Sequence, residues 1–313
     1  MNMETQTAYL APEGYTARLA GELEGVLETR DRLVLTDRPP QPTFWVRNTW
    51  LNPVVLRIAS INDAARQLKA IQRNWCLYSS ALHRRAALIQ EKLPHVSARP
   101  LKFPSPLPQA PLGSWTLLDT GTVLASPRCS NPFPNGEIHF EEDRTGPPSR
   151  AYLKLWEAWT RVRAYPKAGE FCIDAGGSPG GWCWAIQALG ARVLSVDRSS
   201  LDPRVLALPG VEFKQANAFS LKPQAFDRVD WIFSDVVCYP EKLYEWVTEW
   251  VDSGRCGNLI CTLKFQGEYQ PGIVRRFAQI PGSQVLHLFH NKHELTWIRL
   301  AGEEKITPLP GEG

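Results

Sequence analysis

The second half of the chain alternates short apolar runs with stretches in which apolar residues recur every three or four positions. The apolar runs are predicted strands and cover residues 170–174, 193–197, 230–234 and 258–263. The periodic stretches are predicted helices and cover residues 149–162, 181–189 and 241–251. This alternation favours an α/β fold in which helices cover both faces of a parallel sheet. Two last apolar runs, 284–289 and 295–300, predict a terminal antiparallel hairpin.

The first half of the chain mixes strand and helix patterns in another order. Predicted strands cover residues 7–10, 32–36, 43–49 and 54–58, and predicted helices cover 15–25 and 62–75. This order fits a small α+β domain of the β-α-β-β-α-β kind. The proline-rich stretch Ala98–Pro111 cannot form a regular helix or a central strand, and a predicted hairpin follows it at 115–125. We therefore expect an N-terminal domain at 1–97, a linker at 98–113 and the sheet domain at 114–313.

Composition excludes two broad classes. The 313 residues contain no run of 18 apolar positions and no N-terminal signal pattern, which argues against a membrane span and against secretion. The seven cysteines are scattered without a C-x-x-C pair, which favours reduced thiols in a cytoplasmic protein and no zinc site. His287, His290 and His293 lack the acidic or thiolate partners that would complete a metal site, so we expect no metal.

Basic residues are concentrated between Arg57 and Lys102. Nine basic and two acidic residues give this segment a net charge of +7, whereas the whole chain has +3. Within the segment, one predicted helix carries a basic stripe and a basic pair follows it; these residues are Arg66, Lys69, Arg73, Arg84 and Arg85. The pattern predicts contact with the phosphates of a nucleic acid, here RNA. The alternative interpretation is an ordinary solvated helix face.

A glycine-rich loop with the sequence D-A-G-G-S-P-G-G-W follows the predicted strand at 170–174. Glycines allow positive φ and let the backbone approach a ligand closely. Asp197 ends the next strand, where an acid accepts hydrogen bonds from a ribose diol. A nicotinamide dehydrogenase is an alternative, but the loop lacks the G-x-G-x-x-G pattern and Pro179 removes an N–H that could bind a pyrophosphate. A glycine turn without a ligand is the other alternative.

The loop resembles the first motif of the FtsJ-type RNA 2′-O-ribose methyltransferases, which ends in P-G-G-W or P-G-G-F. Further segments in the same order also resemble that family: S-R-A-Y-L-K-L at 149–155, D-W-I-F-S-D at 230–235, L-I-C-T-L-K at 259–264 and H-E-L-T-W-I at 293–298. The closest resemblance is to the RlmM type, which methylates a cytidine ribose of large-subunit ribosomal RNA and carries a ferredoxin-like and THUMP-like N-terminal region. The resemblance implies a Rossmann-like domain, S-adenosylmethionine as cofactor and ribosomal RNA as partner.

The resemblance also assigns residues. The catalytic Lys-Asp-Lys-Glu tetrad of the family falls on Lys154, Asp235, Lys264 and Glu294. The expected cofactor contacts are Ser149, Gly176, Ser178, Pro179, Gly180, Gly181, Trp182, Asp197, Asn217 and Asp235. At Asn217 the RlmM type has an acidic residue, and the asparagine oxygen can accept the same hydrogen bond from an adenine amino group.

The implied reaction is an in-line attack of a ribose 2′-oxygen on a sulfonium methyl group. A free lysine has a pKa of about 10.4, so it acts as a base only where burial or a second cation lowers that value. We hypothesise that Lys264 is the base and that Lys154 is the second cation, with the carboxylates of Asp235 and Glu294 orienting both lysines. The tetrad could instead act only as an orienting network. A non-catalytic RNA-binding or ribosome-assembly factor with the same fold remains an alternative function.

Overall fold

A computed structural model describes residues 5–302, which divide into two compact units on either side of the His139–Phe140 bond. The units are described separately below. Within the described range, no helix is long and apolar enough to cross a membrane.

The C-terminal unit is built on a seven-stranded sheet in the order β12-β11-β10-β13-β14-β16-β15. The strands are β10 (Phe171–Ala175), β11 (Arg192–Asp197), β12 (Val211–Gln215), β13 (Val229–Ser234), β14 (Cys256–Lys264), β15 (Ser283–Leu286) and β16 (Glu294–Arg299). The pairings among β10 to β14 are parallel, whereas β16 pairs antiparallel with both β14 and β15. The predicted Rossmann-like sheet with a terminal antiparallel pair is therefore confirmed.

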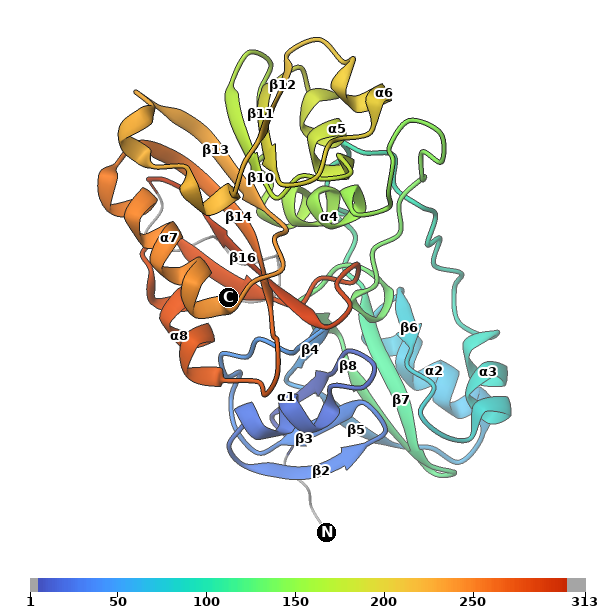
Figure 1. The fold of residues 1–313 in the computed structure, drawn as a ribbon. Coiled ribbons are helices and arrows are strands. Elements are labelled where there is room, and N and C mark those ends of the chain that lie inside the picture. The colour runs from blue at the N-terminus through green and yellow to red at the C-terminus, as the bar shows by residue number, and fades with distance from the viewer. Residues whose placement is uncertain (1–4, 303–313) are drawn as a thin grey trace. The chain divides into compact units, whose positions relative to one another are not determined.

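Helices pack on both faces of this sheet. They are α4 (Tyr152–Val162), α5 (Gly181–Gln187), α6 (Pro203–Leu206), α7 (Pro240–Ser253) and α8 (Pro271–Gln279). Figure 1 shows α4 and α5 on one side of the strands and α7 and α8 on the other. The apolar stripe of α7 is buried as its spacing predicts, through Leu243, Trp246, Val247 and Trp250.

The strand order reverses at β10, which pairs with β11 on one side and with β13 on the other. At such a switch point the loops at the carboxyl ends of the strands diverge and leave a crevice for a ligand. The loops that follow β10, β11, β12 and β13 therefore gather the candidate site residues at one edge of the sheet.

The N-terminal unit contains two sheets. A five-stranded antiparallel sheet has the order β2-β3-β1-β4-β9, and a four-stranded sheet has the order β5-β8-β7-β6. The strands are β1 (Thr7–Leu10), β2 (Val26–Arg30), β3 (Leu33–Thr36), β4 (Asn48–Leu51), β5 (Val54–Arg57), β6 (Trp75–Leu77), β7 (Gly113–Asp119), β8 (Thr122–Ser126) and β9 (Arg128–Cys129). The helices are α1 (Thr16–Glu22), α2 (Ile61–Ile71) and α3 (His83–Gln90).

The predicted hairpin at 115–125 is present as β7 and β8, but it lies in this N-terminal unit. It pairs with β5 and β6, and Trp115, Leu117 and Val123 join a core with α2 and α3. The division between the units consequently falls at 139/140, whereas we expected the second domain to begin at residue 114. The proline-rich stretch connects α3 to β7 inside the unit.

The β-α-β-β-α-β detail of the N-terminal prediction is not confirmed. The strands predicted at 7–10, 32–36 and 54–58 are present as β1, β3 and β5, and the first helix as α1. However, β2 lies where no strand was predicted, the strand predicted at 43–49 is β4 at 48–51, and β5 belongs to the other sheet. Helix α2 also ends at Ile71 rather than at residue 75, because Gln72 is extended and Trp75 begins β6. Trp75 is fully buried in β6. Because a buried residue of a strand is apolar as well, it extended the helical spacing of the preceding residues and misled the prediction.

Candidate active site

The four residues of the predicted tetrad converge at the carboxyl edge of the C-terminal sheet. Lys154 projects from α4, Asp235 follows β13, Lys264 ends β14 and Glu294 begins β16. They come from segments as far as 140 residues apart in the sequence, and the antiparallel pairing of β14 with β16 sets Lys264 opposite Glu294.

The tetrad is a chain of alternating charges. Lys154 Nζ lies 2.6 Å from Glu294 Oε1 and 3.4 Å from Asp235 Oδ1, and Lys264 Nζ lies 2.9 Å from Asp235 Oδ1. Lys264 also donates a hydrogen bond to the backbone carbonyl of Asp235. Thr262 Oγ1 donates to Asp235 Oδ1 at 2.6 Å, so Asp235 is fixed by both lysines and by a hydroxyl that the sequence did not point to.

Burial and charge act in opposite directions on the pKa values of this cluster. Burial alone would lower the pKa of Lys154, but the carboxylates of Asp235 and Glu294 outweigh it and raise that pKa above the ordinary value. Burial would likewise raise the pKa of Asp235, yet Lys154 and Lys264 leave it below its ordinary value. The pKa of Glu294 is lowered against burial by Lys154. Lys154 and both carboxylates are therefore charged at neutral pH.

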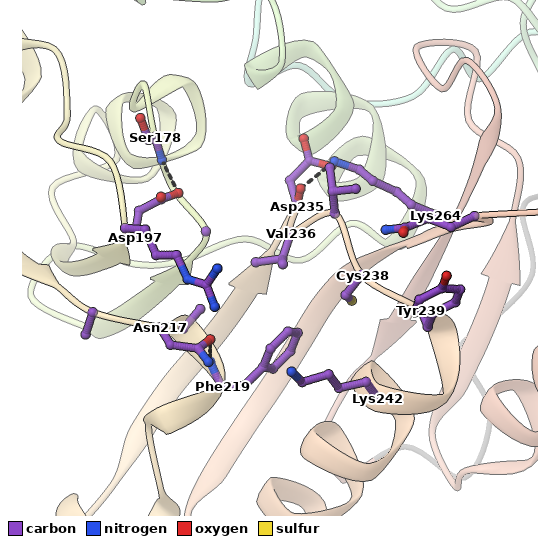
Figure 2. Close-up of a pocket in the computed structure, with 16 residues that line it drawn as sticks. Ser178, Asp197, Asn217, Phe219, Asp235, Val236, Cys238, Tyr239, Lys242 and Lys264 are labelled. Carbon is purple, nitrogen blue, oxygen red and sulfur yellow. Dashed lines mark hydrogen bonds and ion pairs between the residues drawn. The ribbon is translucent and has the colours of Figure 1, made fainter.

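A cavity of about 600 Å³ opens beside the tetrad. Figure 2 shows Ser178 and Asp197 at one end of it and Lys264 at the other, with Asp235 and Val236 between them. Asp235 and Lys264 line the cavity, whereas Lys154 and Glu294 are not among its lining residues in the described chain. Lys264 is thus the lysine of the tetrad that a ligand in the cavity would meet.

The glycine loop brings bare backbone to the same cavity. Gly176 has φ +82°, and a Cβ there would lie 2.1 Å from Val236 Cγ2. A Cβ on Gly177 would lie 2.2 Å from Ser195 Oγ, and one on Gly181 would lie 2.4 Å from Ser149 Oγ. The loop therefore requires glycine at these positions, by conformation at the first and by space at all three.

Two polar residues shape the end of the cavity farther from Lys264. Asp197 accepts hydrogen bonds from the backbone N–H groups of Ser178 at 3.1 Å and Ser199 at 2.9 Å, which fix its carboxylate at the end of β11. Asn217 Oδ1 accepts from the backbone N–H of Phe219 at 3.2 Å and so begins a short 3₁₀ turn. A carbonyl oxygen has two lone pairs, so Asn217 keeps acceptor capacity for a ligand.

The structure separates the predicted cofactor residues into two groups. Those that line the cavity are Gly176, Ser178, Asp197, Asn217 and Asp235. The others are in or beside the loop without lining the cavity, namely Ser149, Pro179, Gly180, Gly181 and Trp182. Trp182 is 3% exposed and its Nε1 donates to the carbonyl of Ala151, which is a packing role. The hydroxyl of Ser149 is buried without a hydrogen-bond partner among residues 5–302.

Several lining residues were not predicted. They are Arg198, Ala216, Ala218, Phe219, Val236, Val237, Cys238, Tyr239, Lys242 and Gln266. All of them lie in loops or helix starts that come directly after β11, β12, β13 or β14. The rule that ligands bind at the carboxyl ends of parallel strands could have identified these positions.

The predicted basic residues all lie in the N-terminal unit. Arg66 and Lys69 are on α2, Arg84 and Arg85 are on α3, and Arg73 lies beyond the end of α2. Arg66 pairs with Asp63, while Lys69, Arg73 and Arg84 are exposed and form no ion pair with described residues. The helices α2 and α3 pack on each other, so four of these residues occur on adjoining elements.

The histidines have structural partners. His290 Nδ1 lies 2.8 Å from Glu157 Oε2, and that carboxylate also accepts the backbone N–H of His290. In the part of the chain that the structure describes, no cluster of histidine, cysteine and acidic side chains could hold a metal ion.

Comparison with known proteins finds a family match within the C-terminal unit. Residues 147–288 match the family described as FtsJ-like methyltransferase. Two curated relatives, from Aromatoleum aromaticum and Halorhodospira halophila, carry the name ribosomal RNA large subunit methyltransferase M, and each is 33% identical to this chain. The alignments cover 47% and 52% of this chain and 44% and 50% of the relatives, so the chain matches about half of their length. A crystal structure of an rRNA methylase from Streptococcus thermophilus matches 49% of this chain and 98% of its own, with 10% identity and a TM-score of 0.36.

Proposed function

Because residues 147–288 match the FtsJ-like methyltransferase family, as the motifs predicted, we propose that this protein methylates a ribose 2′-hydroxyl of RNA. The proposed substrate is large-subunit ribosomal RNA. The observation that carries the proposal is Lys264, which faces the cavity beside the glycine loop and is held there by Asp235.

The methyl donor of this class of enzyme is S-adenosylmethionine, and the residues of the cavity fit it. Asp197 offers a carboxylate at the end of β11 to the ribose diol of an adenosine, and Asn217 offers an acceptor to its adenine. A Cβ on Gly176 would collide with Val236, so glycine at this position keeps the loop beside the cavity. The buried hydroxyl of Ser149, which has no described partner, adjoins the start of α5 and is suited to the carboxylate of the methionine part.

The reaction forms a bond between the ribose 2′-oxygen and the methyl carbon. The methyl–sulfur bond breaks with its electron pair going to sulfur, and the hydroxyl proton must leave the oxygen. We assign the proton to Lys264 Nζ, because it is the cavity-facing amine of the tetrad; in this step Lys264 accepts the proton as an uncharged amine and becomes an ammonium beside Asp235. Alignment of oxygen, carbon and sulfur by the cavity would supply much of the acceleration.

Lys154 has a different role in this mechanism. Its raised pKa keeps it protonated, so it is a fixed positive charge and not a base. Positioned between Asp235 and Glu294, it balances two carboxylates and holds Asp235, which in turn holds Lys264 at the cavity.

The N-terminal unit is proposed to engage the RNA. Lys69, Arg73 and Arg84 are exposed cations without a described ionic partner, which is the state in which a basic side chain is available to phosphate. Such contacts would position the RNA without reading its sequence.

The test is transfer of labelled methyl from S-adenosylmethionine to unmodified ribosomal RNA, followed by alkaline digestion. A 2′-O-methyl group blocks cleavage at its own phosphodiester, so the label should appear in an alkali-resistant dinucleotide. We expect Lys264→Ala to lower the rate about 10²–10⁴-fold, the range of a general base. Lys222→Ala is the matched control, because Lys222 is exposed and pairs with Glu249 away from the cavity.

Other outcomes select the alternatives. Label on a base or on protein would refute ribose methylation. Tight RNA binding by a folded wild-type protein that transfers no label would favour an RNA-binding or assembly factor. Stabilisation by NAD instead of S-adenosylhomocysteine would favour a dehydrogenase, since a ligand that binds only the folded state raises its melting temperature.

A further inference from the structure

The loop that links Asp235 to α7 carries the two most exposed large hydrophobic side chains of the described chain. Val237 is 69% exposed and Tyr239 is 59% exposed, whereas the next most exposed large hydrophobic residue, Leu206, is 44% exposed. Both residues lie within four positions of the central carboxylate of the tetrad. Large apolar side chains exposed beside a reaction centre indicate contact with a ligand.

Tyr239 has no partner that would explain its exposed position. Its ring stacks on no aromatic ring, and its hydroxyl makes no hydrogen bond with the residues at 5–302. Its backbone carbonyl accepts hydrogen bonds from the N–H groups of Lys242 and Leu243 in the first turn of α7. The aromatic side chain is therefore not needed to hold the helix.

Tyr239 lies at the end of the cavity proposed for the acceptor nucleotide and not at the end proposed for the cofactor. In Figure 2 its ring lies on the Lys264 side of the cavity, and Asp197 and Ser178 lie on the opposite side, beyond Val236. The end of the cavity proposed for adenosine already has an aromatic side chain, Phe219, close to Asn217. The ammonium of Lys242 lies over this ring, with Nζ 5.2 Å from the ring centroid.

A second, smaller hollow continues from the cavity past Tyr239. Tyr239 and Gln266 line both spaces, and Phe265 and Pro240 are among the other lining residues of the second. A nucleotide whose 2′-oxygen lies at Lys264 needs room for its base next to that point. The hollow, of about 80 Å³, adjoins that point, with Tyr239 and Gln266 in its lining.

We propose that Tyr239 is a substrate-positioning residue on which the base of the acceptor nucleotide stacks, with Gln266 facing the edge of that base. This inference rests on the proposed function, since it requires that RNA be the acceptor. RNA enzymes and single-strand binders commonly hold unstacked bases on exposed aromatic rings, and amide side chains can donate to and accept from base edges.

The first test separates binding from chemistry. Stacking of one base contributes about 1–3 kcal/mol, so Tyr239→Ala should raise the KM for RNA on the order of tenfold or more. Tyr239→Phe and Tyr239→Trp should restore it, because both keep a π face. The Kd for S-adenosylhomocysteine should be unchanged in all three variants. Leu206→Ala is the matched control, since it shortens another exposed apolar side chain, one that does not line the cavity.

The second test does not depend on turnover. Ribosomal RNA transcripts that contain 5-iodopyrimidines are irradiated with the protein and S-adenosylhomocysteine, and crosslinked peptides are identified by mass spectrometry. We expect a crosslink at Tyr239. An unchanged KM in Tyr239→Ala together with no crosslink there would overturn the proposal, and so would a weakened Kd for S-adenosylhomocysteine, which would place the ring against the cofactor. A wild-type protein that crosslinks at Tyr239 but transfers no methyl group would refute the proposed function alone.

Discussion

Lys264 and Glu294 are opposite each other in the β14–β16 ladder, yet their charged groups have different partners. Glu294 Oε1 lies 2.6 Å from Lys154 Nζ, and Lys264 Nζ lies 2.9 Å from Asp235 Oδ1. The ion pairs therefore form a chain in the order Glu294–Lys154–Asp235–Lys264. The lysine that faces the cavity is at one end of this chain, and a buried carboxylate is at the other. We therefore expect Glu294 to influence the reaction mainly through Lys154, its ion-pair partner.

This arrangement predicts the effect of Glu294→Gln. The change removes one of the two carboxylates that hold Lys154, and a hydrogen bond to a charged group contributes about 1.5–3 kcal/mol. We expect methyl transfer to fall on the order of 10–100-fold, while the Kd for S-adenosylhomocysteine stays unchanged because Glu294 does not line the cavity. Single-turnover transfer and calorimetric binding measure the two quantities. Glu249→Gln, at an exposed ion pair, is the control, and wild-type activity in Glu294→Gln would disprove the role.

A second prediction concerns Asp174, the penultimate residue of β10, just before the glycine loop. It is fully buried, and neither carboxylate oxygen has a side-chain hydrogen-bond partner among residues 5–302. Burial raises its pKa to about 8, with further contributions from the negative charges of Asp235 and Asp197. At neutral pH Asp174 is therefore mostly a neutral acid.

The sign of the pH effect follows from that shift. Between about pH 4 and pH 8 the unfolded chain has released this proton and the folded protein retains it, so the free energy of unfolding falls as pH rises. A difference of four pKa units corresponds to on the order of 5 kcal/mol. Asp174→Asn should remove this fall, which urea unfolding at pH 5 and pH 8 would measure. Asp227→Asn, at an exposed position, is the control; an equal pH dependence in Asp174→Asn and wild type would contradict the prediction.

A third prediction tests the packing below the loop. In Gly177→Ala the new methyl group would lie 2.2 Å from Ser195 Oγ and 2.4 Å from Asp174 Oδ2, and both side chains are fully buried. We expect a loss of about 1–3 kcal/mol of stability from overpacking. Gly272→Ala is the matched control, since its methyl group meets nothing within 4 Å in α8 and should be neutral or stabilising. Thermal unfolding of both variants gives the comparison, and equal melting temperatures would argue against a tightly packed loop.

The sequence predicted the parallel sheet and its glycine loop because these depend on local patterns of apolar runs, glycines and strand-end acids. It missed α8, whose first residues Pro271 and Gly272 have the composition of a turn, and β6, whose Trp75 also fits a helical spacing. The family motifs named the tetrad, but the support of Asp235 by Thr262 depends on strand register across β14, which no local pattern reveals. The position of Tyr239 likewise depends on which loops the switch point brings together.

The last prediction addresses the proposed RNA surface of the N-terminal unit. Each phosphate contact releases condensed counterions, so losing one should reduce the slope of log K against log salt by about 1. We expect Lys69→Ala and Arg84→Ala to weaken RNA binding to a similar extent for all RNA sequences and to lower that slope additively. Lys222→Ala, which removes a paired lysine of the other unit, is the control. Fluorescence anisotropy over a range of salt concentrations measures the slope. If the double variant kept the wild-type slope, the basic residues of α2 and α3 would be an ordinary solvated surface, and the RNA would have to be bound by other parts of the chain.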